Sequence, residues 1–79
     1  MPNDNPEEDK FSLLLSVNDK PHRIASTATL LQLLDELALA STKGLAVAIN
    51  DGVVSRSHWP VQRLTDGDRV LIIQATQGG

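Results

Sequence analysis

Residues 29–40, TLLQLLDELALA, decide the fold class because their apolar side chains repeat with the period of an α-helix. The apolar positions i, i+3, i+4, i+7 and i+8 of one helical face are Leu30, Leu33, Leu34, Leu37 and Ala38. Thr29 and Gln32 have the spacing of a capping box, which predicts the start of the helix. Gly44, at the end of residues 41–44, can adopt the positive φ that closes a helix, so we expect the helix to stop there.

On the N-terminal side of this helix the sequence has the period of a β-strand. Apolar residues occupy alternate positions from Phe11 to Val17, although Leu14 interrupts the alternation. Residues 18–21, NDKP, supply turn chemistry. Residues 22–25 are short enough to be the returning strand, so we expect a β-hairpin here.

On the C-terminal side, residues 45–49 alternate again, and we expect Asp51 and Gly52 to turn the chain back into a strand at residues 53–55. Residues 69–74, RVLIIQ, are a continuous apolar run of the kind found at the centre of a sheet. The predicted order is therefore two strands, a helix, two strands and a final strand. This order indicates an α+β fold.

One helix covers only one face of such a sheet, so the two faces need separate residues. We expect the following residues to point toward the helix: Phe11, Leu13, Leu15, Val17, Leu45, Val47, Ile49, Val70 and Ile72. The opposite face would then carry Leu14, Ala46, Ala48, Leu71 and Ile73. An apolar patch on a small domain usually marks a surface for a partner. We expect Trp59 to fill the core at the rim of the sheet; the alternative is that a loop or the Trp59 segment partly covers this face.

The composition excludes several classes of function. The chain has 79 residues, no cysteine and a formal charge of 7 − 10 = −3. Residues 1–10 hold four acidic residues, two prolines and one lysine, so we predict a flexible acidic tail, with a specific docking arm as the alternative. The remaining charges balance, which argues against nucleic acid as a partner. Without a long apolar stretch we expect no membrane contact and a cytoplasmic protein.

The polar residues show little catalytic chemistry of their own. His22 and His58 are far apart in sequence and lack a cluster of other ligands, so we expect both at the surface and no metal site. Residues 66–68, Asp-Gly-Asp, resemble the start of a calcium loop, but Leu71 and Gln77 stand where that loop requires glycine and glutamate. We therefore predict a turn. The sequence also lacks phosphate-binding glycine motifs and a nucleophile elbow.

The C-terminus is the remaining candidate site. Residues 75–79 contain no core residue and end in Gly78 and Gly79, so we predict a flexible tail. Two residues without Cβ let a chain enter a narrow channel and leave its carboxylate open. Five extended residues reach about 16 Å, enough to place that carboxylate inside another protein. A carboxylate is a poor electrophile, so it would need activation by a partner.

Several short motifs resemble one family in their order and spacing. They are AIN at residues 48–50, VSR at residues 54–56 followed by Trp59, DGDRVLI at residues 66–72, and the terminal Gly78-Gly79. From about residue 11 to residue 79 the chain resembles the sulfur carrier family of thiamine biosynthesis (ThiS), which belongs to the ubiquitin-like carriers. Members of that family commonly have proline where Ser55 stands, a departure that concerns a local loop.

The resemblance implies a ubiquitin-like β-grasp domain in residues 11–74, a mixed sheet with one helix packed on one face. It also implies that the chain is a cosubstrate and not an enzyme. A ThiF-type adenylating enzyme would use ATP and magnesium to activate the Gly79 carboxylate, and the chain itself would bind no cofactor. A sulfur donor with a cysteine persulfide would then supply the sulfur of a thiocarboxylate, which the carrier delivers to the thiazole synthase ThiG.

By the same resemblance, two sets of residues meet these partners. Those of the tail that enter the partner's channel ahead of Gly79 are Thr76, Gln77 and Gly78. Those of the docking surface are Leu71, Ile73, Leu14, Ala46 and Ala48.

Three other functions remain open at this point. The small subunit of molybdopterin synthase shares the fold and the adenylation, but its final strand usually runs into a proline-containing segment that residues 74–77 lack. A ubiquitin-like protein modifier would join Gly79 to lysines. A purely structural interaction domain would not need Gly79.

Overall fold

The computed structural model describes residues 12–75. In chain order its elements are β1 (Ser12–Val17), β2 (Lys20–Ala25), α2 (Leu30–Glu36), β3 (Leu45–Ile49), β4 (Gly52–Val54), the 3-10 helix η1 (Arg56–His58) and β5 (Arg69–Gln74). The predicted order of strands and helix is confirmed. The expected acidic tail at 1–10, Phe11 of the expected inward set, and residues 76–79 of the expected C-terminal tail lie outside the described residues.

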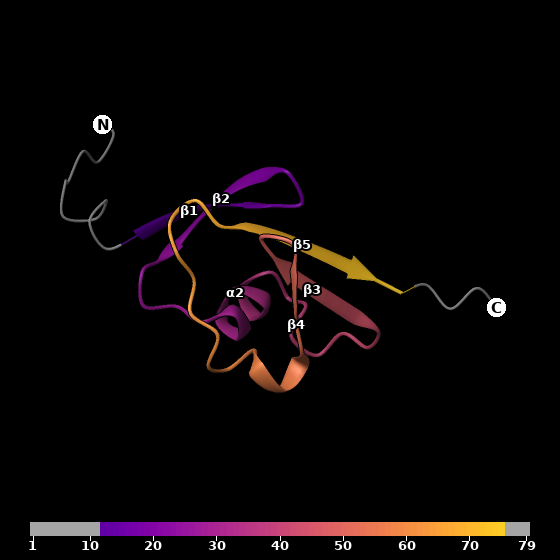
Figure 1. The fold of residues 1–79 in the computed structure, drawn as a ribbon. Coiled ribbons are helices and arrows are strands. Elements are labelled where there is room, and N and C mark those ends of the chain that lie inside the picture. Colours follow the sequence, from indigo (N-terminus) through magenta and orange to yellow (C-terminus); the bar gives the residue numbers. More distant parts are fainter. Residues whose placement is uncertain (1–11, 76–79) are drawn as a thin grey trace.

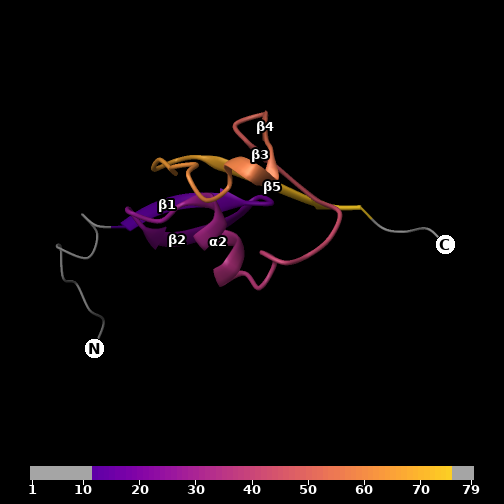
Figure 2. The same ribbon diagram turned by 90° about the horizontal axis from the view of Figure 1, so that it is seen from below.

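The strands form a mixed sheet in the order β2-β1-β5-β3-β4 (Figure 1). β5 is the central strand, as its continuous apolar run predicts. It runs parallel to β1, where Val17 lies opposite Val70, and antiparallel to β3, where Val47 lies opposite Ile72. The helix α2 lies against one face of this sheet (Figures 1 and 2). The predicted α+β architecture is therefore confirmed.

The start of α2 is the one that the sequence predicts. Thr29 Oγ1 accepts a hydrogen bond from the Gln32 N–H at 3.3 Å, and Gln32 Oε1 accepts one from the Thr29 N–H at 2.8 Å. This reciprocal capping box satisfies two N–H groups that the helix itself leaves without partners. The first turns then bury Leu30, Leu33 and Leu34 completely.

The end of α2 corrects our prediction, because the helix stops at Glu36 and not beside Gly44. Ala38 takes a left-handed conformation with φ +62°, and the Leu39 N–H donates to Leu34 O at 2.7 Å. These are features of a Schellman motif, which closes a helix. The early end lets both Leu37 and Leu39 pack against the core. In a continuous helix these two residues would point in nearly opposite directions.

The core lies between α2 and the sheet. Its buried residues are Leu15, Ile24, Ala28, Leu30, Leu33, Leu34, Val47, Trp59, Leu64 and Val70. Trp59 fills the core, as expected, and its indole N–H donates to Val54 O at 3.1 Å. Its backbone O accepts from the Leu31 N–H at 3.0 Å, which ties the Trp59 segment to the helix. Trp59 therefore belongs to the helix side and does not cover the opposite face of the sheet.

The first hairpin turn begins at Asn18 as expected but ends two residues earlier, and the second turn lies one residue earlier than expected. The turn between β1 and β2 consists of Asn18 and Asp19, and the turn between β3 and β4 consists of Asn50 and Asp51; all four have positive φ. Two successive residues with positive φ define the tight turn that matches the twist of a hairpin, and Asn and Asp tolerate this conformation better than other non-glycine residues. As a result β2 starts at Lys20, and Gly52 is already part of β4.

Candidate functional site

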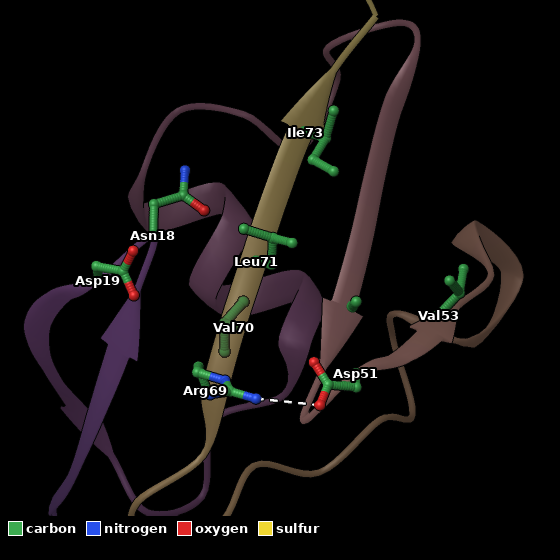
Figure 3. A pocket seen from close by; sticks show the side chains of 9 residues that line it. Asn18, Asp19, Asp51, Val53, Arg69, Val70, Leu71 and Ile73 are labelled. Atoms are coloured by element: carbon green, nitrogen blue, oxygen red, sulfur yellow. Dashed lines mark hydrogen bonds and ion pairs between the residues drawn. The ribbon is translucent and has the colours of Figure 1, made fainter.

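The face of the sheet opposite α2 exposes large apolar side chains of β5. Figure 3 looks onto this face, with the helix behind the sheet. Leu71 is 48% exposed and Ile73 56% exposed, whereas Val70 between α2 and the sheet is 0% exposed. Successive strand residues point to opposite faces, so the side chains of β5 alternate between the core and the face away from α2. We call this side of the sheet the open face; the residues that we predicted for it are Leu14, Ala46, Ala48, Leu71 and Ile73.

Of the five residues that we predicted for the open face, four are exposed and one is half-buried. Leu14 is 43% exposed, Ala46 is exposed and Ala48 is half-buried. Ala46 lies opposite Ile73, and Ala48 lies opposite Leu71. Because the neighbours of Leu71 and Ile73 on β3 are alanines, the two larger side chains stand clear of the sheet.

Our sequence analysis missed Val53, which is 81% exposed on β4. Val53 lies opposite Ala48 across the β3–β4 ladder, which extends the open face to the edge of the sheet. The signal was present in the sequence: Val53 and Val54 are adjacent strand residues, so one of them has to point away from the helix.

A pocket of about 530 Å³ lies on the open face (Figure 3). It is lined by Asn18, Asp19, Ala48, Asp51, Val53, Arg69, Val70, Leu71 and Ile73. The hairpin turns contribute the two carboxylates, and Arg69 contributes a cation whose Nη2 lies 3.1 Å from Asp51 Oδ2. Both partners of this ion pair are largely exposed, so water screens their attraction. The pocket is thus apolar on β3, β4 and β5 and charged where β5 begins.

The start of β5 is fastened by the Asp-Gly-Asp segment. Asp66 Oδ1 accepts from the Leu14 N–H at 2.8 Å. The buried Asp68 accepts from Asn50 Nδ2 and from the Thr65 N–H, each at 2.8 Å. The predicted turn is confirmed, and both carboxylates serve as hydrogen-bond acceptors for the fold.

The end of β5 is fastened on both of its edges. On the β1 side, Asn18 Oδ1 accepts from the Ile72 N–H at 2.7 Å, and Asn18 Nδ2 donates to Ile72 O at 3.2 Å. On the β3 side, the Ala75 N–H donates to Gly44 O at 2.8 Å. Gly44 has φ +73°, and a Cβ there would lie 3.4 Å from the Ala75 Cβ. The backbone is therefore held up to the residue that precedes Thr76.

Sequence reasoning did not assign these roles to Asn18 and Gly44. It interpreted Asn18 as turn chemistry and Gly44 as a helix stop. Both residues have positive φ, and asparagine and glycine are the residue types that favour this conformation, so the sequence does indicate the local turn. The long-range contacts to β5 have no local signal, because the partner residue depends on strand pairing.

His58 is exposed, as we expected, whereas His22 is half-buried. His22 Nε2 lies 3.1 Å from Glu36 Oε1, and His58 Nδ1 lies 3.3 Å from Ser55 Oγ. Among residues 12–75 no group of three or more potential metal ligands is found. Within the same residues, α2 is too short to cross a membrane and no other helix has the length and apolar character to do so.

Comparison with known proteins identifies the family. The model of the ThiS family matches residues 15–79. The chain belongs to the ThiS family. The sulfur carrier protein ThiS of Escherichia coli (strain K12) is 36% identical to it over 62 residues, which are 78% of this chain and 92% of that protein.

Solved structures of ThiS proteins share the fold. A crystal structure of the thiamine biosynthesis protein ThiS from Geobacter metallireducens matches with a TM-score of 0.72 and 29% identity, over 85% of this chain and 100% of the other. A solution NMR structure of a thiamine biosynthesis protein from the same organism matches with a TM-score of 0.68 and 29% identity, over 85% and 88% of the two chains. The ubiquitin-like β-grasp fold that the resemblance implied is thereby confirmed.

The terminal residues that we predicted to carry the chemistry, Thr76, Gln77, Gly78 and Gly79, lie outside the described residues. The ThiS family model extends over all of them. What the structure adds is the starting point of this segment: Ala75, bound to Gly44 at the end of the central strand.

Proposed function

We propose that this chain is a sulfur carrier of thiamine biosynthesis whose Gly79 carboxylate becomes a thiocarboxylate. The observation that carries the proposal is the match of the ThiS family model through residue 79. The E. coli relative is itself a sulfur carrier protein. Because both this relative and the Geobacter proteins are ThiS or thiamine biosynthesis proteins, the thiamine route takes precedence over the molybdenum cofactor route.

The chemistry follows from the weakness of a carboxylate as an electrophile. A ThiF-type enzyme with ATP and magnesium would join the Gly79 carboxylate to AMP and release pyrophosphate. The terminal sulfur of a cysteine persulfide on a donor protein would attack this acyl-adenylate and expel AMP, forming an acyl disulfide. A second thiol would then cleave the S–S bond, so that Gly79 keeps the sulfur as a thiocarboxylate and the two thiols form a disulfide.

The absence of cysteine suits this role. A thiol in the chain would attack the activated carbonyl or exchange with the acyl disulfide. With no cysteine in the sequence, the transferred sulfur has no competitor within the carrier. The chain would hold no cofactor, because ATP and magnesium belong to the activating partner.

The open face is the proposed docking surface for the ThiF-type enzyme and for ThiG. Leu71 and Ile73 lie on the strand that leads into the tail, next to Ala48 and Ala46 of β3. Leu14 belongs to the same face but lies beside the start of β5, where its backbone binds Asp66 and Gly67. A partner that covers these side chains also receives the chain end, since Gly79 follows Ile73 by only six positions. Leu71 and Ile73 are each about half exposed, so covering either one contributes about half of the value for full burial, roughly 0.7–1.5 kcal/mol, to association.

Intact-mass measurement tests the proposal directly. After incubation with a ThiF-type enzyme, ATP, magnesium and a persulfide donor, we expect the chain to gain about 16 Da, the difference between sulfur and oxygen. The gain should disappear without ATP and in a chain that lacks Gly79. Because the described core lies within residues 12–75, the shortened chain should retain its fold. An unchanged mass for the full chain, or equal thiazole formation by the shortened chain, would refute the proposal.

A further inference from the structure

The Asn18 side chain makes hydrogen bonds to β5 that a further backbone residue of β1 would otherwise make. The β1–β5 ladder ends where Val17 pairs with Val70, and the Asn18 N–H still donates to Val70 O at 2.9 Å. The chain then turns away into β2. The Asn18 amide nevertheless reaches Ile72, accepting from its N–H at 2.7 Å and donating to its O at 3.2 Å. One side chain thus supplies the acceptor and the donor that a neighbouring strand would supply.

The hydrogen bonds of Asn18 hold the part of β5 that carries the proposed docking residues. Ile72 lies between Leu71 and Ile73, the two exposed apolar side chains of the central strand. Figure 3 shows Asn18 beside β5 on the same side as Asp19, with Leu71 and Ile73 on the strand next to it. On the other edge of β5, the ladder with β3 and the Ala75–Gly44 hydrogen bond continue to the end of the described residues. On the β1 side, the Asn18 side chain therefore provides the hydrogen bonds to the last residues of β5.

We propose that Asn18 is a positioning residue for the carrier's reaction. By holding Ile72, its amide keeps Leu71 and Ile73 presented on the open face and fixes the direction in which the chain leaves toward Gly79. The role acts through the β5 backbone, and Asn18 does not itself touch the reacting carboxylate. This inference rests on the proposed function for its kinetic consequence, whereas its structural consequence can be measured on the isolated chain.

The physical effect is a change in the population of the docking-competent strand end. Without the amide, the end of β5 is paired on the β3 edge alone, and it opens more often. A partner then meets a competent surface for a smaller fraction of the time, which raises the apparent KM in proportion. Once the complex has formed, the partner itself holds the strand, so kcat should change little.

The test substitution is Asn18→Gly, because glycine adopts the positive φ of the turn without strain and removes the side chain that carries the amide. In the isolated chain we expect hydrogen exchange of the Ile72 amide to accelerate about tenfold, as expected for the loss of two hydrogen bonds from a strand end. With the ThiF-type enzyme, an opening constant about tenfold larger raises KM for the carrier about threefold when the wild-type strand end is open about a fifth of the time. We expect this rise together with a kcat within about twofold of the wild type.

Asn50→Gly is the matched control. Asn50 is the equivalent first residue of the other hairpin turn, and its amide binds the start of β5: Oδ1 accepts from the Arg69 N–H at 2.9 Å and Nδ2 donates to Asp68. This variant should accelerate exchange at Arg69 and lower the denaturation midpoint, but leave KM unchanged at temperatures where it is folded. A second variant, Asn18→Asp, keeps the acceptor for the Ile72 N–H and places a carboxylate oxygen near Ile72 O, so it should raise KM as Asn18→Gly does.

The outcomes separate this inference from the proposed function. Unchanged exchange at Ile72 in Asn18→Gly would overturn the inference whether or not the chain carries sulfur. Faster exchange with an unchanged KM, in a wild-type chain that is activated normally, would also overturn it and leave the proposed function intact. An equal rise of KM in Asn50→Gly would show a general loss of stability and refute a specific role for Asn18. If the wild-type chain is not activated at all, the proposed function fails together with the kinetic role.

Discussion

The two faces of the central strand have similar side chains and different tasks. Val70 and Ile72 point toward α2 and contact the core, whereas Leu71 and Ile73 on the same strand point to the open face. The two sets differ in what covers them and hardly at all in hydrophobicity. Apolar character alone therefore does not identify core residues in a domain of this size. The position of α2, the single α-helix of residues 12–75, makes one face the source of stability and leaves the other for a partner.

Truncating one leucine to alanine on each side of the sheet tests whether the two faces stabilise the fold equally. Leu34→Ala removes a side chain that is fully buried between α2 and the sheet, and we expect it to lower the free energy of unfolding by about 3 kcal/mol. Leu71→Ala removes a half-exposed side chain and should change it by about 0.5 kcal/mol or less. Urea denaturation of both variants measures the difference. Similar losses would mean that the open face is part of the stabilising core.

A charge on the open face should separate binding from folding. Ile73→Glu places a carboxylate on the proposed docking surface, and we expect the affinity for a ThiF-type partner to fall about thirtyfold, because burial of the charge is costly. The free energy of unfolding should fall by about 1 kcal/mol or less, chiefly from the lower strand propensity of glutamate. Titration calorimetry and thermal unfolding give the two values. Ser41→Glu, at an exposed neutral loop residue of this chain, controls for the same change of −1 in net charge.

The left-handed residue that closes α2 offers a test of the stability on the covered side of the sheet. Ala38 closes α2 with φ +62°, a conformation that glycine adopts without the steric conflict of a Cβ. Ala38→Gly should therefore raise the free energy of unfolding, by about 1 kcal/mol, although glycine usually weakens helical segments. The matched change Ala40→Gly, at a neighbouring position that is absent from the residues with positive φ, should not stabilise. A lower unfolding midpoint for Ala38→Gly would contradict the Schellman closure.

The smallest expected effect concerns the charged rim of the pocket. Asp51→Asn keeps a residue that tolerates positive φ and removes the exposed ion pair with Arg69. We expect the free energy of unfolding to change by about 0.5 kcal/mol or less. Unfolding at low and at high salt checks this, because a strong ion pair would make the difference between variant and wild type depend on salt. A loss of more than about 1 kcal/mol would show that this rim stabilises the fold.

The elements of the fold were predictable because their signals are local. The capping box at Thr29, the helical repeat of leucines and the apolar run at 69–74 each depend on residues a few positions apart. The structure confirms the capping box, the central strand and the repeat as far as Leu34, but it ends the helix before Leu37 and Ala38. The open face was predictable for the same reason, since alternation along a strand assigns Leu71 and Ile73 to the side opposite Val70. The errors, namely the length of α2 and the positions of the two turns, occurred where several residues could take a left-handed conformation.

Local sequence patterns are enough to predict the order of elements, the two-sided central strand and the importance of the terminal glycines, which the ThiS family model also covers. The packing of the whole domain selects Ala38 as the left-handed residue that closes the helix, and it brings Asn18 and Gly44 to the end of β5. Asn18 and Ile72 are 54 positions apart, so no local preference links them. Their contact exists because β1 and β5 lie side by side in the sheet, and that pairing depends on burying the core of the whole domain at once.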